Sequence, residues 1–158
     1  MKIQLLISTQ KKKLDWAKAK FGHLYCFVVN QVESEILSVN DDYFRSYQES
    51  GLSKSRNRSI QNASSDICVI CDDDIMMLSD YQDKIENAYK VYPDADIITF
   101  QIVTLENSPY KRYPINRKKH NRYSILKVSS IEITFRLESI KSSNIKFDER
   151  FGLGSIYG

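Results

Sequence analysis

Four uninterrupted apolar runs constrain the fold of this chain more than any other feature. A strand with one solvated face alternates apolar and polar side chains, whereas a strand buried on both faces is apolar throughout. Fully buried strands are therefore predicted at Ile3 to Ser8, Leu24 to Asn30, Ile67 to Asp72 and Asp96 to Thr104. Helical patterns alternate with these runs at Leu14 to Phe21, Ser53 to Ala63 and Ser79 to Tyr92. The alternation predicts an α/β fold in which helices flank a mostly parallel sheet.

The helix predicted from Ser79 to Tyr92 has the clearest boundaries. Ser79 and Gln82 have the spacing of a capping box, and Pro93 directly follows the helix. Beyond it, residues 106 to 124 hold two prolines, many basic groups and little periodicity, which predicts a basic flap or long excursion. Extended structure is expected to resume at Ile125 to Val128 and Ile131 to Leu137. No linker divides residues 1 to 158, so we expect a single domain.

Composition narrows the class of protein. The net charge of the 158 residues is only +3, which gives the molecule as a whole no strong attraction to nucleic acid. No apolar run approaches the roughly 20 residues that span a bilayer. Cys68 and Cys71 lie three apart in a predicted strand and face opposite sides, which favours buried structural thiols over a redox pair. We expect a cytoplasmic protein without a transmembrane segment, and peripheral contact with the inner face of the membrane stays open.

Polar residues follow three of the predicted strands, at the edge where a parallel sheet binds its ligands. They are Ser8-Thr9, Asn30-Gln31 and Asp72 to Asp74, and the segment Gly51 to Asn57 enters a helix at the same edge. The helix entry offers donors and a fixed positive charge from Ser53, Arg56 and Asn57 to a nucleotide or its phosphates. By itself this segment equally fits a turn and a helix cap.

Asp72, Asp73 and Asp74 form a run of carboxylates at the end of a buried strand. Adjacent carboxylates repel one another and lose hydration near a core, so a cation or ligand donors must neutralise them. Their hard oxygen atoms suit Mn²⁺ or Mg²⁺. Alone, the run equally fits a polar turn. Together with the helix entry, it favours a divalent metal and a phosphate-bearing substrate.

These segments, in this order, resemble family 2 glycosyltransferases of the GT-A fold, which are nucleotide-diphospho-sugar transferases. The resemblance rests on Ser8-Thr9, Gly51-Leu-Ser-x-Ser-Arg-Asn57, the DxD-type run Asp72-Asp-Asp74, and Phe147-Asp-Glu-Arg-Phe-Gly-Leu-Gly154. It implies transfer of a sugar, with inversion, from a nucleoside-diphosphate sugar to a hydroxyl acceptor. The implied acceptor is a saccharide or lipid-linked saccharide, in the synthesis of a surface polysaccharide or glycoconjugate.

The resemblance also implies roles for single residues. Thr9 would lie near the base, Asp72 and Asp73 near the ribose, and Arg56 near the base or diphosphate. Asn30 and Gln31 stand where the family commonly has an acidic residue that contacts the base. Ser53 and Asn57 would complete the nucleotide-sugar site. Asp74, with Asp72, would hold the metal.

The catalytic base stays unknown at this point. The resemblance places this acidic residue after Gly158, so we expect residues 1 to 158 to be the donor-binding portion of a longer protein. Asp148 and Glu149 are candidates within the chain, although carboxylates beside Arg150 are more often part of a surface ion pair. His23 and His120 have no partner at metal-ligand spacing.

Two other classes of function remain open. A metal-dependent nucleotidyltransferase would use the same carboxylates for attack at a phosphate. A non-catalytic nucleic-acid-binding module would use the basic, tyrosine-containing flap. The small net charge and the lack of a recognition motif argue against the second, so nucleic acid is not an expected partner.

Overall fold

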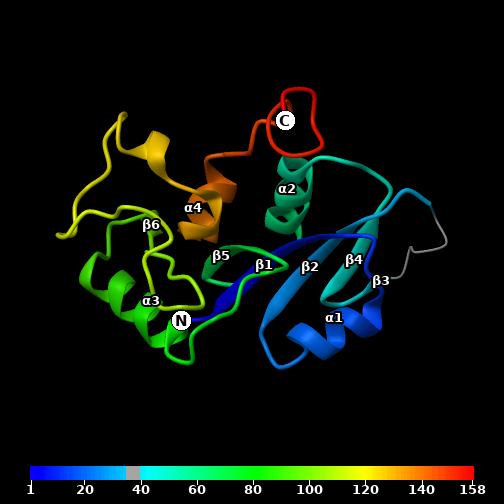
Figure 1. Cartoon of the computed structure of the whole chain (residues 1–158), viewed down its shortest axis with the longest axis horizontal. Coiled ribbons are helices and arrows are strands. Elements are labelled where there is room, and N and C mark those ends of the chain that lie inside the picture. Colours follow the sequence, from blue (N-terminus) through cyan, green and yellow to red (C-terminus); the bar gives the residue numbers. More distant parts are fainter. Residues whose placement is uncertain (35–39) are drawn as a thin grey trace.

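A computed structural model gives the structure of the protein and describes residues 1–34 and 40–158. In these residues, seven strands form one mixed sheet in the order β3-β4-β2-β1-β5-β7-β6 (Figure 1). The strands are β1 (Ile3–Gln10), β2 (Cys26–Gln31), β3 (Asn40–Asp41), β4 (Phe44–Tyr47), β5 (Ile67–Asp72), β6 (Ile97–Thr99) and β7 (Ile133–Arg136). The α-helices are α1 (Leu14–Phe21), α2 (Leu52–Asn62), α3 (Tyr81–Val91) and α4 (Leu137–Ser142), and the 3₁₀ turns are η2 (Ile125–Lys127) and η3 (Ser130–Glu132).

The centre of the sheet is parallel, as predicted. β1 pairs with β2 on one side and β5 on the other, and β2 also pairs in parallel with β4. The remaining pairings, β3 with β4 and β7 with both β5 and β6, are antiparallel. The three central strands are buried along nearly their whole length, which explains their continuous apolar sequences.

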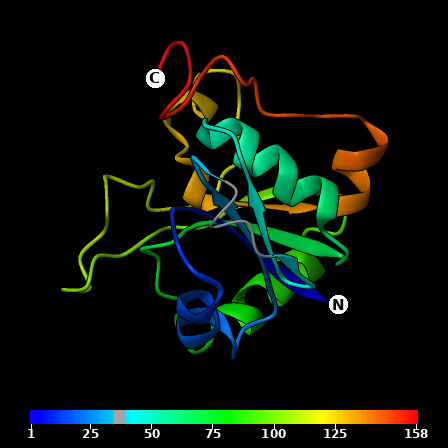
Figure 2. The ribbon, with the colours of Figure 1, turned by 90° about the vertical axis from the view of Figure 1, so that its right-hand side faces the viewer.

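Helices cover both faces of the sheet, and the sheet separates the apolar core into two clusters. One apolar cluster joins Leu5 and Ile7 of β1 to α1 and α3, whose contributions include Phe21 and Ile85. The other joins Leu6 of β1 to α2 and α4. Figure 2 shows the two helix layers on opposite sides of the sheet. Because successive residues of β1 face opposite layers, neither face can be polar.

The second half of the chain departs from the predictions. The run predicted as a strand from Asp96 to Thr104 is a strand only over Ile97–Thr99. Beyond it the exposed and half-buried residues alternate, and the chain leaves the sheet. Ile125–Lys127 is a 3₁₀ turn and not extended, because Ile125 and Val128 donate backbone hydrogen bonds within local turns.

Two further predictions need correction. The chain becomes extended only at Ile133, after a 3₁₀ turn that Ser129 and Glu132 close with a true capping box. The helix α4 begins at Leu137, where an extended segment was predicted to end. The capping box predicted at Ser79 is absent, because α3 begins at Tyr81 after Asp80, whose side chain makes no cap bond. That helix does end before Pro93, as expected.

Candidate functional site

Parallel pairing brings the predicted polar residues to one edge of the sheet. Thr9 of β1 lies opposite Asn30 of β2, and Ser8 lies opposite Asp72 of β5. The helix α2 packs against β1 and β2, and the Ser55 hydroxyl on this helix donates a hydrogen bond of 2.9 Å to the Ser8 hydroxyl. This edge therefore combines the ends of three buried strands with the N-terminal half of α2.

Arg56 and Asp72 form a shielded ion pair at this edge. Nη2 of Arg56 donates to Oδ1 of Asp72 over 3.0 Å, and the two side chains are 9% and 36% exposed. The ring centroid of Phe147 lies 5.7 Å from the guanidinium carbon. Nε of Arg56 is buried and has no hydrogen-bond partner among the described residues. Since an unpaired buried donor is costly, this atom is a candidate contact for a bound ligand.

The other two carboxylates of the run have different surroundings. Oδ2 of Asp73 accepts a hydrogen bond of 2.5 Å from the Thr9 hydroxyl, and Lys20 Nζ donates to the Asp73 carbonyl. Asp74 is exposed and makes no hydrogen bond or ion pair within residues 1–34 and 40–158. The three neighbouring aspartates therefore differ: one pairs with an arginine, one with a threonine, and one is available.

The arrangement suits a metal whose ligands come partly from the protein and partly from a bound substrate. Nowhere in the described chain do three or more histidine, cysteine or acidic side chains gather at a spacing that would hold a metal ion. Mg²⁺ is commonly held by one or two carboxylates together with phosphate oxygens and water. Asp74, and the second oxygen of Asp72, fit that partial ligand set. The metal stays a prediction.

Asn30 and Gln31 are buried, and both side chains form hydrogen bonds with neighbouring loops. The Asn30 side chain accepts from the backbone N–H of Lys12 at 3.0 Å, and donates to the Lys12 carbonyl at 2.9 Å and the Ser46 hydroxyl at 3.1 Å. Gln31 Nε2 donates to the Gly51 carbonyl at 3.0 Å. Both side chains therefore position neighbouring loops, and a contact with a nucleotide base would require them to exchange these bonds.

The C-terminal segment lies across the N-terminus of α2. The Leu52 N–H donates to the Leu153 carbonyl over 3.0 Å, and the Ser53 hydroxyl donates to the Phe151 carbonyl over 2.7 Å. Gly51, the residue before the helix, has φ of 119° and offers no side-chain cap. Of the donors predicted for phosphate, the Ser53 hydroxyl is thus already bonded to a carbonyl group of the chain itself.

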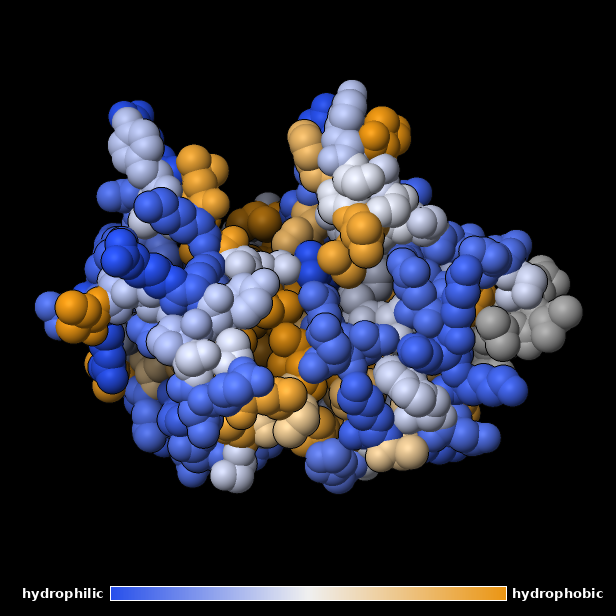
Figure 3. Space-filling model, viewed as in Figure 1, coloured by the Kyte–Doolittle hydropathy of each residue, from blue (hydrophilic) through white to orange (hydrophobic). Residues whose placement is uncertain are grey.

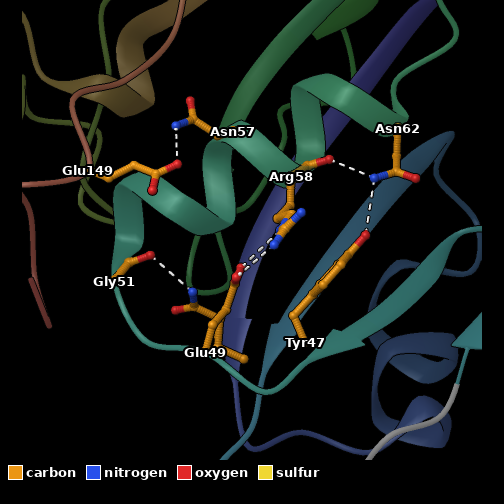
Figure 4. A network of polar contacts seen from close by, with 8 residues as sticks. Tyr47, Glu49, Gly51, Asn57, Arg58, Asn62 and Glu149 are labelled. Atoms are coloured by element: carbon orange, nitrogen blue, oxygen red, sulfur yellow. Dashed lines mark hydrogen bonds and ion pairs between the residues drawn. The ribbon is translucent and has the colours of Figure 1, made fainter.

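Asn57 fastens the same segment one turn further along the helix. Its amide group accepts from the Phe147 N–H at 2.9 Å and donates to the Phe147 carbonyl at 3.0 Å. Asn57 also donates to Oε1 of Glu149 at 3.0 Å (Figure 4). Asn57 therefore holds Phe147 against Arg56. Sequence reasoning missed Phe147 as part of this site, because no local pattern links residues 90 positions apart.

The two acidic candidates for the base differ in charge environment. Asp148 forms a salt bridge of 2.6 Å with Arg150, and hydrogen bonds from Arg150 lower the pKa of Asp148 to about 2. A group with so low a pKa is a poor proton acceptor near neutral pH. Glu149 lies at the surface with one oxygen held by Asn57. Of the two carboxylates, only Asp148 is held in an ion pair among the described residues.

A space-filling view shows a notch between the excursion at residues 106–124 and the C-terminal segment (Figure 3). The floor of this notch is partly apolar, whereas hydrophilic residues dominate the flanking surface. Among the described residues, no helix has both the length and the apolar character needed to cross a membrane.

Solved structures provide the comparison with known proteins. No protein-family model matches the chain, and no curated protein matches it either. A crystal structure of S. aureus TarS residues 1–349 in complex with UDP-GlcNAc is similar to it, with a TM-score of 0.61 at 18% identity over 96% of this chain and 50% of the other. The corresponding complex with UDP gives a TM-score of 0.58 at 16% identity, over 97% and 52%. A longer S. aureus TarS structure gives 0.61 at 16% identity, over 96% and 31%.

These similarities to solved structures concern the fold. The chain spans about half the length of TarS residues 1–349. At 16% to 18% identity the shared feature is the architecture of strands and helices. The predicted α/β fold is therefore confirmed, and it is similar to that of the S. aureus TarS structures.

Proposed function

We propose that residues 1 to 158 are the donor-binding portion of an inverting glycosyltransferase that resembles family 2. Its donor is a nucleoside-diphosphate sugar and its acceptor a hydroxyl group of a saccharide or lipid-linked saccharide. One observation carries the proposal: a buried arginine pairs with Asp72 at the ligand-binding edge, while Asp74, two residues on, is exposed and available. Solved complexes of S. aureus TarS with UDP-GlcNAc and UDP have a similar fold, which supports this class of ligand.

Each residue at the edge has a role in this proposal. Arg56 orients Asp72 toward the ribose, and its unpaired Nε is a donor for the nucleotide. Thr9 holds Asp73 in place. Asp74, with Asp72, would hold Mn²⁺ or Mg²⁺, which when bound would supply positive charge for a leaving diphosphate. Asn30, Gln31, Ser53 and Asn57 shape the surrounding loops through the bonds described above.

Inversion requires a base that removes a proton from the acceptor hydroxyl as the sugar leaves. Within residues 1 to 158, our candidate for this base is Glu149, whose carboxylate accepts a hydrogen bond from Asn57. The proposed setting is the synthesis of a surface polysaccharide or glycoconjugate, on the cytoplasmic side of the membrane.

Calorimetric titration with UDP and UDP-GlcNAc, with and without Mn²⁺, tests the proposal. We expect binding that depends on the metal, and Asp74→Asn should weaken it by about 5-fold to 150-fold, the equivalent of about 1–3 kcal/mol. Asp94→Asn is the matched control, since Asp94 is an exposed aspartate that precedes β6 at the opposite edge of the sheet. Equal affinity in wild type and Asp74→Asn would remove Asp74 from the site.

The same titrations separate the competing functions. Preference for a nucleoside triphosphate over the diphosphate would favour nucleotidyl transfer. Salt-sensitive binding of an oligonucleotide, without binding of UDP, would favour the nucleic-acid module. We also expect little Mn²⁺ binding in the absence of UDP, because the described residues form no cluster of three metal-ligating side chains. Electron paramagnetic resonance of free Mn²⁺, with and without UDP, measures that dependence.

A further inference from the structure

The excursion at residues 106–124, here called the basic excursion, carries more positive charge than the whole protein. It contains six lysine or arginine residues and one glutamate, so its net charge is +5, while the full chain has +3 and the remainder therefore −2. Among the described residues, Lys111 is the one basic side chain of this excursion that forms an ion pair. The positive charge is therefore local and largely uncompensated.

Bulky aliphatic side chains are exposed in and beside the basic excursion. Ile115 is fully exposed, and Leu105 and Leu126 are 83% and 82% exposed. Tyr110 and Tyr123 are exposed as well. Single exposed apolar residues are common on protein surfaces, but here several of them are interleaved with a cluster of lysine and arginine.

The structure supports these exposed side chains on a defined scaffold. Leu105 lies at the tip of a small hairpin that the bridge between Val103 and Pro109 closes. The next part of the excursion is anchored at the buried Glu132, which accepts from the Tyr113 hydroxyl at 2.9 Å and from Lys111 Nζ at 2.6 Å. Figures 1 and 2 show the excursion standing away from the sheet and its helices.

We infer that the basic excursion docks the protein on the surface of an anionic lipid bilayer. Exposed aliphatic residues such as Ile115 enter the headgroup region, while Arg117, Lys118 and Lys119, which begin two positions later, contact anionic headgroups. Nucleic acid or another soluble polyanion complements the charge and the tyrosines, but leaves the aliphatic side chains in water. A bilayer complements both. This inference does not depend on the proposed donor site.

Vesicle sedimentation tests the inference directly. We expect binding to vesicles of phosphatidylcholine mixed with phosphatidylglycerol, little binding to pure phosphatidylcholine, and weakening by salt. The combined substitution Arg117→Gln, Lys118→Gln and Lys119→Gln should lower the partition constant by about 100-fold, since each basic residue near an anionic surface contributes about fivefold. Ile115→Asn should lower it by roughly fivefold to tenfold.

A matched triple variant controls for total charge. Lys2→Gln, Lys13→Gln and Lys146→Gln remove the same charge from exposed sites outside the excursion, and should leave vesicle binding close to wild type. Circular dichroism and thermal melts should be unchanged in every variant, because all the substituted side chains are exposed.

Any one of three results would overturn the inference. The first is the absence of binding to anionic vesicles, and the second is equal binding by both triple variants. The third is oligonucleotide binding that the excursion triple variant abolishes and Ile115→Asn leaves intact, which would assign the surface to nucleic acid.

Discussion

Replacing Arg56 by alanine should destabilise the protein as well as weaken nucleotide binding. The side chain extends from α2 and is buried against Phe147, and its guanidinium group forms an ion pair with Asp72. Truncation therefore removes packed methylene groups and a charged hydrogen bond from the same place.

The expected loss follows from three contributions. Two buried methylene groups contribute about 1.6 kcal/mol. The hydrogen bond between charged groups contributes about 1.5–3 kcal/mol. Loss of the unpaired Nε works in the opposite direction, because burying an unsatisfied donor costs about 1–3 kcal/mol. The middle of each range gives a net destabilisation of about 2 kcal/mol, and we expect a measured loss of about 1–3 kcal/mol.

Urea unfolding measured by the fluorescence of Trp16, the single tryptophan, tests this value. With an m-value of about 2 kcal/mol per molar urea, the midpoint should fall by roughly 0.5–1.5 M. Arg58→Ala is the matched control on the same helix. Arg58 is 43% exposed, against 9% for Arg56, and pairs with Glu49, whose side chain is 15% exposed (Figure 4), so Arg58→Ala removes less buried side chain and should lower the midpoint less than Arg56→Ala.

A wild-type midpoint for Arg56→Ala would refute the packing argument. If nucleotide binding were lost in that variant at unchanged stability, Arg56 would serve the ligand alone.

Three further predictions concern other buried groups. Burial raises the pKa of Cys26 and Cys68 to about 11 and that of Cys71 to about 12, so none of the three thiols should react with a disulfide reagent at pH 8 until denaturant is added. The free energy of unfolding should also fall as the pH rises from the ordinary thiol pKa of 9.0 toward 11, since the unfolded chain releases these protons first. Glu132→Gln should lower the urea midpoint by the equivalent of about 1–3 kcal/mol, because the buried carboxylate anchors Lys111 and the Tyr113 hydroxyl, and an unchanged midpoint would contradict that role.

The first half of the fold was predictable because a strand that is buried on both faces has a continuous apolar sequence. Ile3 to Ser8 and Ile67 to Asp72 are strands for that reason, and their parallel pairing gathers Thr9, Asn30 and Asp72 at one edge. The strands at the edges of the sheet were harder to predict from the sequence. In the run from Asp96 to Thr104 only Ile97–Thr99 is strand, because β6 pairs with β7 over those three residues and the continuation alternates in exposure.

The candidate site was predictable in its residue types but not in its contacts. The sequence near Arg56 suggests a charged group at a surface edge, whereas the structure buries it beneath Phe147. The helix entry at Gly51 suggests free N–H groups, whereas carbonyl groups of residues 151 to 153 accept hydrogen bonds from it. Both differences arise from a segment distant in sequence, which no local propensity can reveal.

Strands that are neighbours in the sheet are also synthesised at different times. β1 is made before both of its neighbours, and the residues of β5 that cover its second edge follow 64 positions later. β6 is made before β7 but pairs with β7 alone, so among the described strands it has no place in the sheet until Ile133–Arg136 has emerged. A nascent chain that has not reached β7 leaves the backbone N–H and C=O groups on this edge of β5 unpaired, and such an edge is a site at which another chain can pair.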